Sequence, residues 1–102
     1  MVRSYLIDLR IKKDYSHRKV ARESGMSYQH YARLESGARG GKVSLVIMGR
    51  IAHTLDVSLE DIYQLEEKYQ NKVQRLKEKD LYDDEDYWLL WKWYWFFYPR
   101  SR

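Results

Sequence analysis

The spacing of apolar side chains over residues 3–79 predicts five consecutive helices. Apolar residues recur every three or four positions, which is the period of a helix with one buried face. We expect the helices at residues 3–13, 17–24, 28–35, 45–55 and 59–79. The side chains expected to face inward on the first and fourth are Leu6, Ile7, Leu9, Arg10, Leu45, Ile47 or Met48, Ile51, Ala52 and Leu55. The pattern therefore favours an all-α fold.

Residues 16–37 carry the local signals of two short helices joined by a tight turn. Ser16 and Ser27 are good N-caps, because a serine hydroxyl can accept a hydrogen bond from a backbone N–H of the first turn. Gly25 stands between the two helices, where a positive φ costs least in glycine. The side chains expected to pack inward are Val20, Ala21, Ser24, Tyr31 and Leu34. Two helices in this arrangement suit a DNA major groove.

The fifth predicted helix has no clear end within a compact five-helix core. Ser58 is its expected N-cap, and no Gly or Pro interrupts its apolar stripe, which consists of Ile62, Leu65, Tyr69, Val73 and Leu76. A helix of about 20 residues projects beyond such a core, so its outer stripe must be covered by something else.

An acidic segment and an aromatic segment follow this helix. Residues 80–86 contain five acids in seven positions, and residues 87–98 contain nine aromatics in twelve. We expect the aromatic segment to be a helix, because acids precede it and bases follow it. Its many aromatic residues leave a strand as the alternative. Burying about six of these rings is worth on the order of 10 kcal/mol before entropy, so we expect a second chain to cover the tail. The residues expected at this dimer or partner interface are Tyr69, Val73, Leu76, Trp88, Trp91 and Trp95.

Basic charge is concentrated in the first part of the chain. The 102 residues carry a net charge of +4: residues 1–58 hold 11 Lys/Arg and 5 Asp/Glu, net +6, and residues 59–102 hold 8 and 10, net −2. A basic domain beside a two-helix motif favours nucleic acid, because it can neutralise phosphates. The absence of cysteine excludes a disulfide framework and the usual structural zinc sites, and it fits a reducing cytoplasm. No signal pattern and no apolar run of membrane-spanning length is visible.

Ser16, Ala21, Gly25 and the closing Glu35-Ser36-Gly37 follow one another at a characteristic spacing. This order of capping residue, alanine, glycine turn and Glu-x-Gly resembles the helix-turn-helix of the phage-repressor-like family, the Cro/C1 or xenobiotic-response-element type. The resemblance covers about residues 3–65, with Asp56 where the family commonly has glycine. It implies a five-helix lambda-repressor-like DNA-binding domain at residues 1–65, to which residues 66–102 add an extended fifth helix and the aromatic tail.

The resemblance also implies which side chains meet double-stranded DNA. In this docking mode the first turn of the second motif helix faces the base edges. Gln29 can pair with adenine and Arg33 with guanine, each through two hydrogen bonds. The expected base contacts are Ser27, Tyr28, Gln29, His30 and Arg33, with a phosphate as the alternative partner of Tyr28. The expected phosphate contacts are His17, Arg18, Arg39 and Lys42. Some of these contacts have an alternative interpretation. Tyr28 and His30 could be solvated residues on the helix surface, and Arg39 and Lys42 could only make a loop soluble.

Arg10 and Glu35 fill the positions where the family often joins its first helix to the end of its third through an ion pair. Such a partly buried pair would fix the angle between the helices. The chain offers little for catalysis, because His17, His30 and His53 have no carboxylate or nucleophile at a recurring spacing, and the acids at residues 83–86 lack the calcium-loop pattern. We therefore expect no enzyme, no cofactor and no metal site.

The leading hypothesis is a sequence-specific transcriptional regulator, a repressor, that binds a palindromic operator as a homodimer in the cytoplasm. The alternative is an autoregulated interaction protein, such as an antitoxin or a phage-type inhibitor, whose aromatic tail binds another protein. A tail that lies on a membrane surface is a third possibility, which the acids of residues 80–86 and the lack of a polar face oppose.

Overall fold

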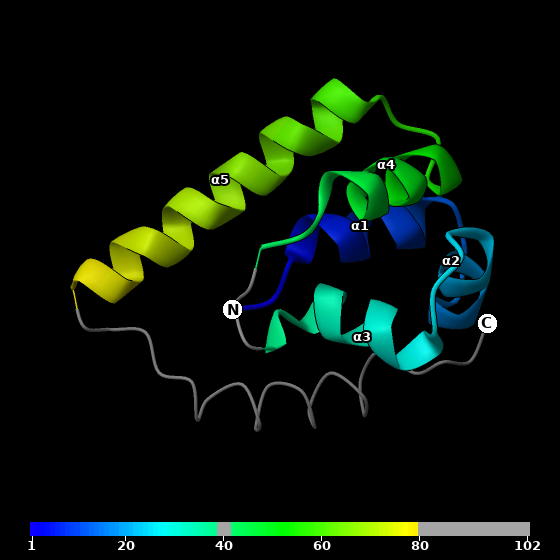
Figure 1. Cartoon of the computed structure of the whole chain (residues 1–102), viewed down its shortest axis with the longest axis horizontal. Helices are drawn as coiled ribbons and strands as arrows, with labels where there is room; N and C mark the ends of the chain where they lie inside the picture. Colours follow the sequence, from blue (N-terminus) through cyan, green and yellow to red (C-terminus); the bar gives the residue numbers. More distant parts are fainter. Residues whose placement is uncertain (39–41, 80–102) are drawn as a thin grey trace.

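Five helices make up the described part of the chain. A computed structural model describes residues 1–38 and 42–79, and within them there is no β-strand. The helices are α1 (Ser4–Lys12), α2 (His17–Glu23), α3 (Tyr28–Ser36), α4 (Leu45–Thr54) and α5 (Leu59–Glu78). Helices α1 to α4 lie close together, whereas α5 crosses one side of this group and extends past it (Figure 1). The expected all-α architecture is confirmed, and each helix end lies within one residue of the expected position.

Three of the helix-to-helix connections share one three-residue design. Each has a residue of positive φ, then an apolar residue, then a serine: Asp14-Tyr15-Ser16, Gly25-Met26-Ser27 and Asp56-Val57-Ser58. The N–H of the apolar residue donates to the carbonyl five residues earlier, at 3.1, 2.9 and 3.0 Å respectively. The serine hydroxyl then accepts from the backbone N–H three residues later. One helix is thus ended and the next begun by local hydrogen bonds alone, as expected for all three serine caps.

The core receives a fully buried side chain from every helix. These side chains, each with 0% of its surface exposed, are Leu6, Val20, Tyr31, Ile51 and Ile62. The small residues Ala21 and Ala52 are also buried, so α2 and α4 can approach their neighbours closely. The five helices therefore share a single core.

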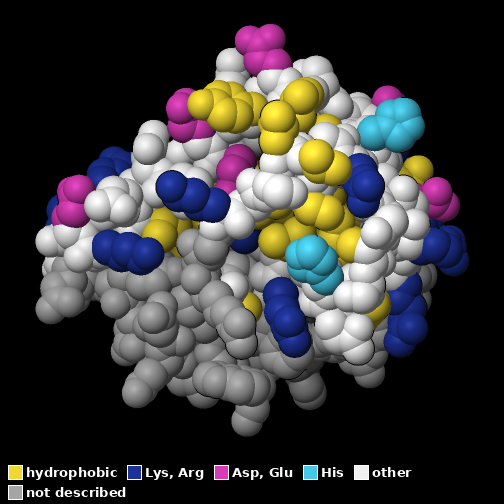
Figure 2. All heavy atoms as spheres, viewed as in Figure 1, with side chains coloured by type: hydrophobic (Ala, Val, Ile, Leu, Met, Phe, Trp, Pro, Cys, Tyr) yellow, Lys and Arg dark blue, Asp and Glu magenta, His cyan; other side chains and the backbone are white. Residues whose placement is uncertain are grey.

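The expectation that Leu45 is buried is wrong. It is the first residue of α4 and is 69% exposed, and the next residue, Val46, is 63% exposed. Leu45 has the correct helical spacing from the buried Met48, but none of the described elements covers its side chain. Apolar side chains accordingly reach the surface over α4 and the start of α5 (Figure 2).

Helix α5 is continuous for 20 residues, as the uninterrupted stripe predicted. Ile62, Tyr69 and Val73 are buried, while Leu65 and Leu76 are half-buried. Residues 80–102 lie outside the described residues, and with them the expected aromatic helix.

Candidate nucleic-acid interface

The face of α3 that points away from the core carries three polar side chains. Gln29, His30 and Arg33 are exposed, whereas Tyr31 and Glu35 of the same helix are buried. At about 100° per residue, the three outward side chains fall within an arc of about 100°. They are long side chains with donors and acceptors that can reach the edges of bases in a groove.

The first turn of α3 is held by its own cap and by α2. Ser27 Oγ accepts a hydrogen bond from the His30 N–H at 3.0 Å, so this hydroxyl serves the helix. The half-buried ring of Tyr28 lies edge-on to His17, with 6.1 Å between the ring centroids. The Arg18 guanidinium carbon lies 4.6 Å from the centroid of the Tyr28 ring, within the range of a cation–π contact. The side chains of Arg18 and Tyr28 therefore pack against each other where α2 meets α3.

The side chain of His17 is not placed to contact a phosphate. Its side chain is 1% exposed, and its Nε2 lies 3.3 Å from Glu35 Oε1. The ring packs between the helices because α3 brings a buried carboxylate and the rings of Tyr28 and Tyr31 against the start of α2. The exposed Arg18 is the neighbouring side chain that can still reach a phosphate.

Arg10 and Glu35 form a buried ion pair that joins α1 to the end of α3. The Arg10 Nε and Nη2 atoms donate to the two carboxylate oxygens of Glu35, each at 3.0 Å. Arg10 also donates to the Tyr15 carbonyl at 3.0 Å. Burial by itself would raise the pKa of Glu35, but hydrogen bonds from His17 and Arg10 lower that pKa to about 2. The carboxylate is thus charged and fully engaged beneath the outward face of α3.

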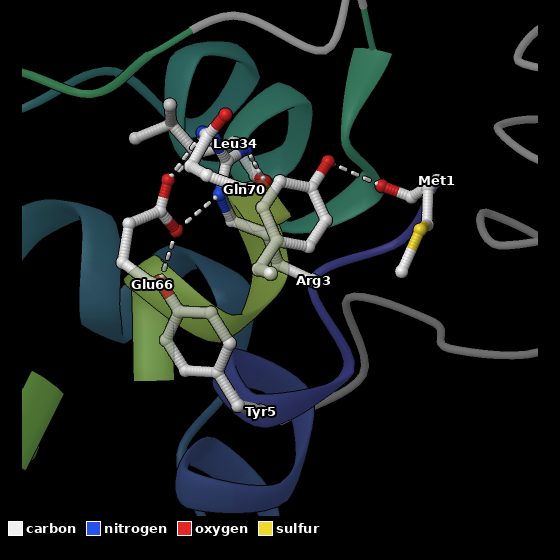
Figure 3. A network of polar contacts seen from close by, with 7 residues as sticks. Met1, Arg3, Tyr5, Leu34, Glu66 and Gln70 are labelled. Atoms are coloured by element: carbon white, nitrogen blue, oxygen red, sulfur yellow. Dashed lines mark hydrogen bonds and ion pairs between the residues drawn. The ribbon is translucent and has the colours of Figure 1, made fainter. Parts of the chain in front are cut away.

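A second, partly buried ion pair ties the start of the chain to α5 (Figure 3). The Arg3 Nε and Nη2 atoms donate to the Glu66 carboxylate at 2.9 and 3.1 Å, and the Tyr5 hydroxyl donates to it at 2.6 Å. Arg3 also reaches α3, because its Nη1 donates to the Leu34 carbonyl at 2.8 Å and its backbone N–H to the Glu35 carbonyl at 2.9 Å. Helix α5 is therefore connected to the end of α3 through one side chain.

Sequence reasoning missed the pair of Arg3 and Glu66, although one half of it left a signal. Glu66 lies four residues after Ile62 and three before Tyr69, and so on the buried stripe of α5. A charged residue in such a position needs a buried partner. Burial raises the pKa of Glu66, but the hydrogen bonds from Arg3, Tyr5 and Gln70 outweigh it and lower the pKa. The partner could not be read from the pattern, since it lies 63 residues away.

The remaining expected site residues are those between α3 and α4, those on α5 and those of the aromatic segment. Lys42 is exposed beside α4, and Arg39 lies outside the described residues. Tyr69 is only 5% exposed. Its hydroxyl donates to the Met1 carbonyl at 2.6 Å, and the Arg3 guanidinium lies over its ring. Tyr69 therefore packs within its own chain and is not open to a second chain. Val73 is likewise buried and Leu76 is half-buried. The expected interface residues Trp88, Trp91 and Trp95 lie outside the described residues.

A helix-turn-helix family model matches residues 6–62, which is more than half of the chain. The chain belongs to the Cro/C1-type helix-turn-helix family. This family is a DNA-binding and not an enzymatic one, and the match spans α2 and α3 as well as most of the core. No curated protein and no solved structure matches the chain.

Two further findings concern the described residues alone. Among residues 1–38 and 42–79 there is no cluster of three or more His, Asp or Glu side chains that could hold a metal ion. In the same part of the chain, no helix combines the length and the apolar character that crossing a bilayer requires.

Proposed function

We propose that this helix-turn-helix protein is a sequence-specific transcriptional repressor that binds a palindromic operator as a homodimer, with the cytoplasm as its site of action. The observation that carries the proposal is the outward set of Gln29, His30 and Arg33 on a helix whose far side is fixed by the buried Arg10–Glu35 pair. The backbone of a rigid helix loses little further freedom on docking, which favours specific binding.

Base reading belongs to Gln29, His30 and Arg33, and backbone contacts belong to Arg18, Tyr28 and Lys42. The first set is exposed on one face of α3, while the second lies where α2 meets α3 and beside the start of α4. Contacts to phosphate fix the position of such a domain, and contacts to base edges provide its specificity.

The size of the domain supports a homodimer. One copy carries one reading helix and so covers half of an operator, whereas two copies related by a two-fold axis would place two such helices about 34 Å apart on one face of the duplex. The support for self-association is the aromatic segment at residues 87–98 together with the exposed apolar Leu59 and Tyr63 of α5. Repression needs only the occupation of a promoter by such a dimer.

Selection of bound sequences from random duplex DNA at stated salt concentration tests the proposal. A palindromic consensus with two half-sites about one helical turn apart is the expected result. Enrichment of no sequence, together with a monomeric and self-adhesive protein in size measurements, would instead favour an interaction protein whose aromatic tail binds another protein.

Single substitutions separate base contacts from phosphate contacts. Arg33→Ala should cost about 1–3 kcal/mol of binding and relax the preference at one base pair. Lys42→Ala should weaken all duplexes alike and reduce the salt slope by about one. Lys77→Ala, near the end of α5, is the matched control and should change neither quantity. Equal losses on every duplex for Arg33→Ala would mean that Arg33 contacts only phosphate.

A further inference from the structure

A hollow of about 350 Å³ lies between the first residues of the chain and residues 65–75 of α5. Lys68, Lys72 and Arg75 line one side of it, and Val2, Leu65 and Tyr69 contribute apolar and aromatic surface. The three cations are spaced by four and three residues, so they lie on one face of the helix. The hollow thus combines a row of positive charge with an apolar floor.

This row of cations has no counter-charge within the described residues. Residues 68–79 hold five Lys/Arg and one Asp/Glu, net +4, and none of Lys68, Lys72 and Arg75 forms an ion pair with a described carboxylate. The nearby Glu66 is engaged with Arg3 instead. Like charges at such spacing destabilise a helix, and an acidic ligand along this face would relieve that repulsion. Lys and Arg side chains lie over this part of α5 (Figure 2).

We propose that this hollow is the docking site for the chain's own acidic segment, residues 80–86. That segment carries five acids and no base, and it also contains Leu81 and Tyr82, which match the apolar floor. Charge and apolar surface are thus matched together, which a bare phosphate backbone would not achieve.

The lengths allow the segment to dock on its own helix. A helix rises about 1.5 Å per residue, so Lys72 lies about 10 Å back from Lys79 along α5. Seven extended residues span about 23 Å, which is enough to turn back and run along this face. A segment tethered this closely has a high effective concentration at the hollow, which favours its own chain over a second copy.

Docking here would place the start of the aromatic run beside the network that holds α5 to α3. The ring of Tyr69 lines the hollow and lies against Arg3, whose side chain reaches the end of α3. The inference goes beyond operator binding, and it is tested without DNA, so its failure would leave the proposed function untouched.

Disulfide trapping in the full chain tests the docking directly. The chain has no cysteine, so engineered cysteines would be its only thiols. Ser4→Cys with Tyr82→Cys keeps every charge and joins a residue that lines the hollow to the third residue of the acidic segment. Gln74→Cys with Tyr82→Cys is the control, because Gln74 is exposed on α5, does not line the hollow and is far closer to Tyr82 along the chain.

We expect the Ser4 pair to close within one chain about tenfold faster than the control pair under dilute oxidising conditions, as read by mass spectrometry and non-reducing electrophoresis. A control pair that closes equally fast or faster would show an undocked segment. A disulfide between two chains would show a second copy in the hollow. Either result would overturn the proposal.

A charge substitution separates attraction in the hollow from a general effect. In the Ser4 and Tyr82 cysteine background, Lys72→Glu should slow closure about fivefold, and adding Asp84→Lys should restore it. Lys77→Glu makes the same charge change on the opposite side of α5 and should leave the rate nearly unchanged. Equal slowing by Lys72→Glu and Lys77→Glu would overturn the proposal, and far-UV circular dichroism confirms that both variants keep the helices.

Discussion

Removal of one partner from the Arg10–Glu35 pair should strongly destabilise the domain. The stability losses of the two single variants should add up to more than the loss of the double variant, in which both partners are replaced. Glu35 is 0% exposed and Arg10 is 4% exposed, and two hydrogen bonds of 3.0 Å join them. Arg10→Met leaves a buried carboxylate without its cation, and Glu35→Leu leaves a buried guanidinium without its anion. Either change should cost about 3–5 kcal/mol, because an uncompensated charge remains inside the protein.

The double variant should recover part of this loss. Replacement of both charges by apolar side chains of similar volume is often close to neutral for a buried pair. Here His17 also loses its carboxylate partner, and the Tyr15 carbonyl loses the donor from Arg10, so some cost remains. We therefore expect a coupling energy of about 2 kcal/mol or more between the two sites.

The same pair gives the domain a pH dependence whose sign follows from Glu35. Its pKa in the folded chain is about 2, below the ordinary value of 4.5. The stabilisation is therefore fully present above pH 4.5 and is lost as the pH falls from 4.5 towards 2. The shift corresponds to about 3 kcal/mol, so the stability difference between the native chain and Glu35→Gln should shrink by this order between pH 7 and pH 2.

Urea unfolding followed by far-UV circular dichroism measures all four proteins of the cycle. Single-variant losses that add up to the double-variant loss within about 0.5 kcal/mol would refute the coupling. A Glu35→Gln difference that stays constant across the acid range would refute the assigned role of the carboxylate.

Three further substitutions test how the start of the chain is held. Gly37→Ala should destabilise by more than about 1 kcal/mol in urea unfolding, because Gly37 has a φ of +74° and an added Cβ would overlap the Met1 carbonyl. Gly49→Ala is the control, because Gly49 lies in α4 with open space around it, and this change should stabilise the protein by about 0.5–1 kcal/mol. An equal loss of stability in both glycine variants would contradict the close approach of Met1 to Gly37. Arg3→Lys should lower the unfolding free energy by about 1.5–3 kcal/mol, since one ammonium cannot replace the paired contacts to Glu66 and the bond to α3; an unchanged urea midpoint would rule this out.

The sequence by itself determined the features that depend on neighbouring residues. Ser16, Ser27 and Ser58 cap helices, and Gly25 has a positive φ, because each of these positions is satisfied within a few residues of the backbone. The length of α5 also followed from its stripe. Even Arg10 and Glu35 could be named as a pair, through the resemblance to a family that often joins these two positions.

Only the tertiary structure decided which surfaces are covered. His17 lies at the start of a helix, where the sequence suggests exposure, but α3 brings Glu35 over it. Leu45 has the spacing of a core residue, yet none of the described elements covers its side chain. Arg3 and Glu66 meet across 63 residues. Helical periodicity determines where a side chain points around the axis of its helix. Which other helix packs against that side chain depends on the packing of the whole chain.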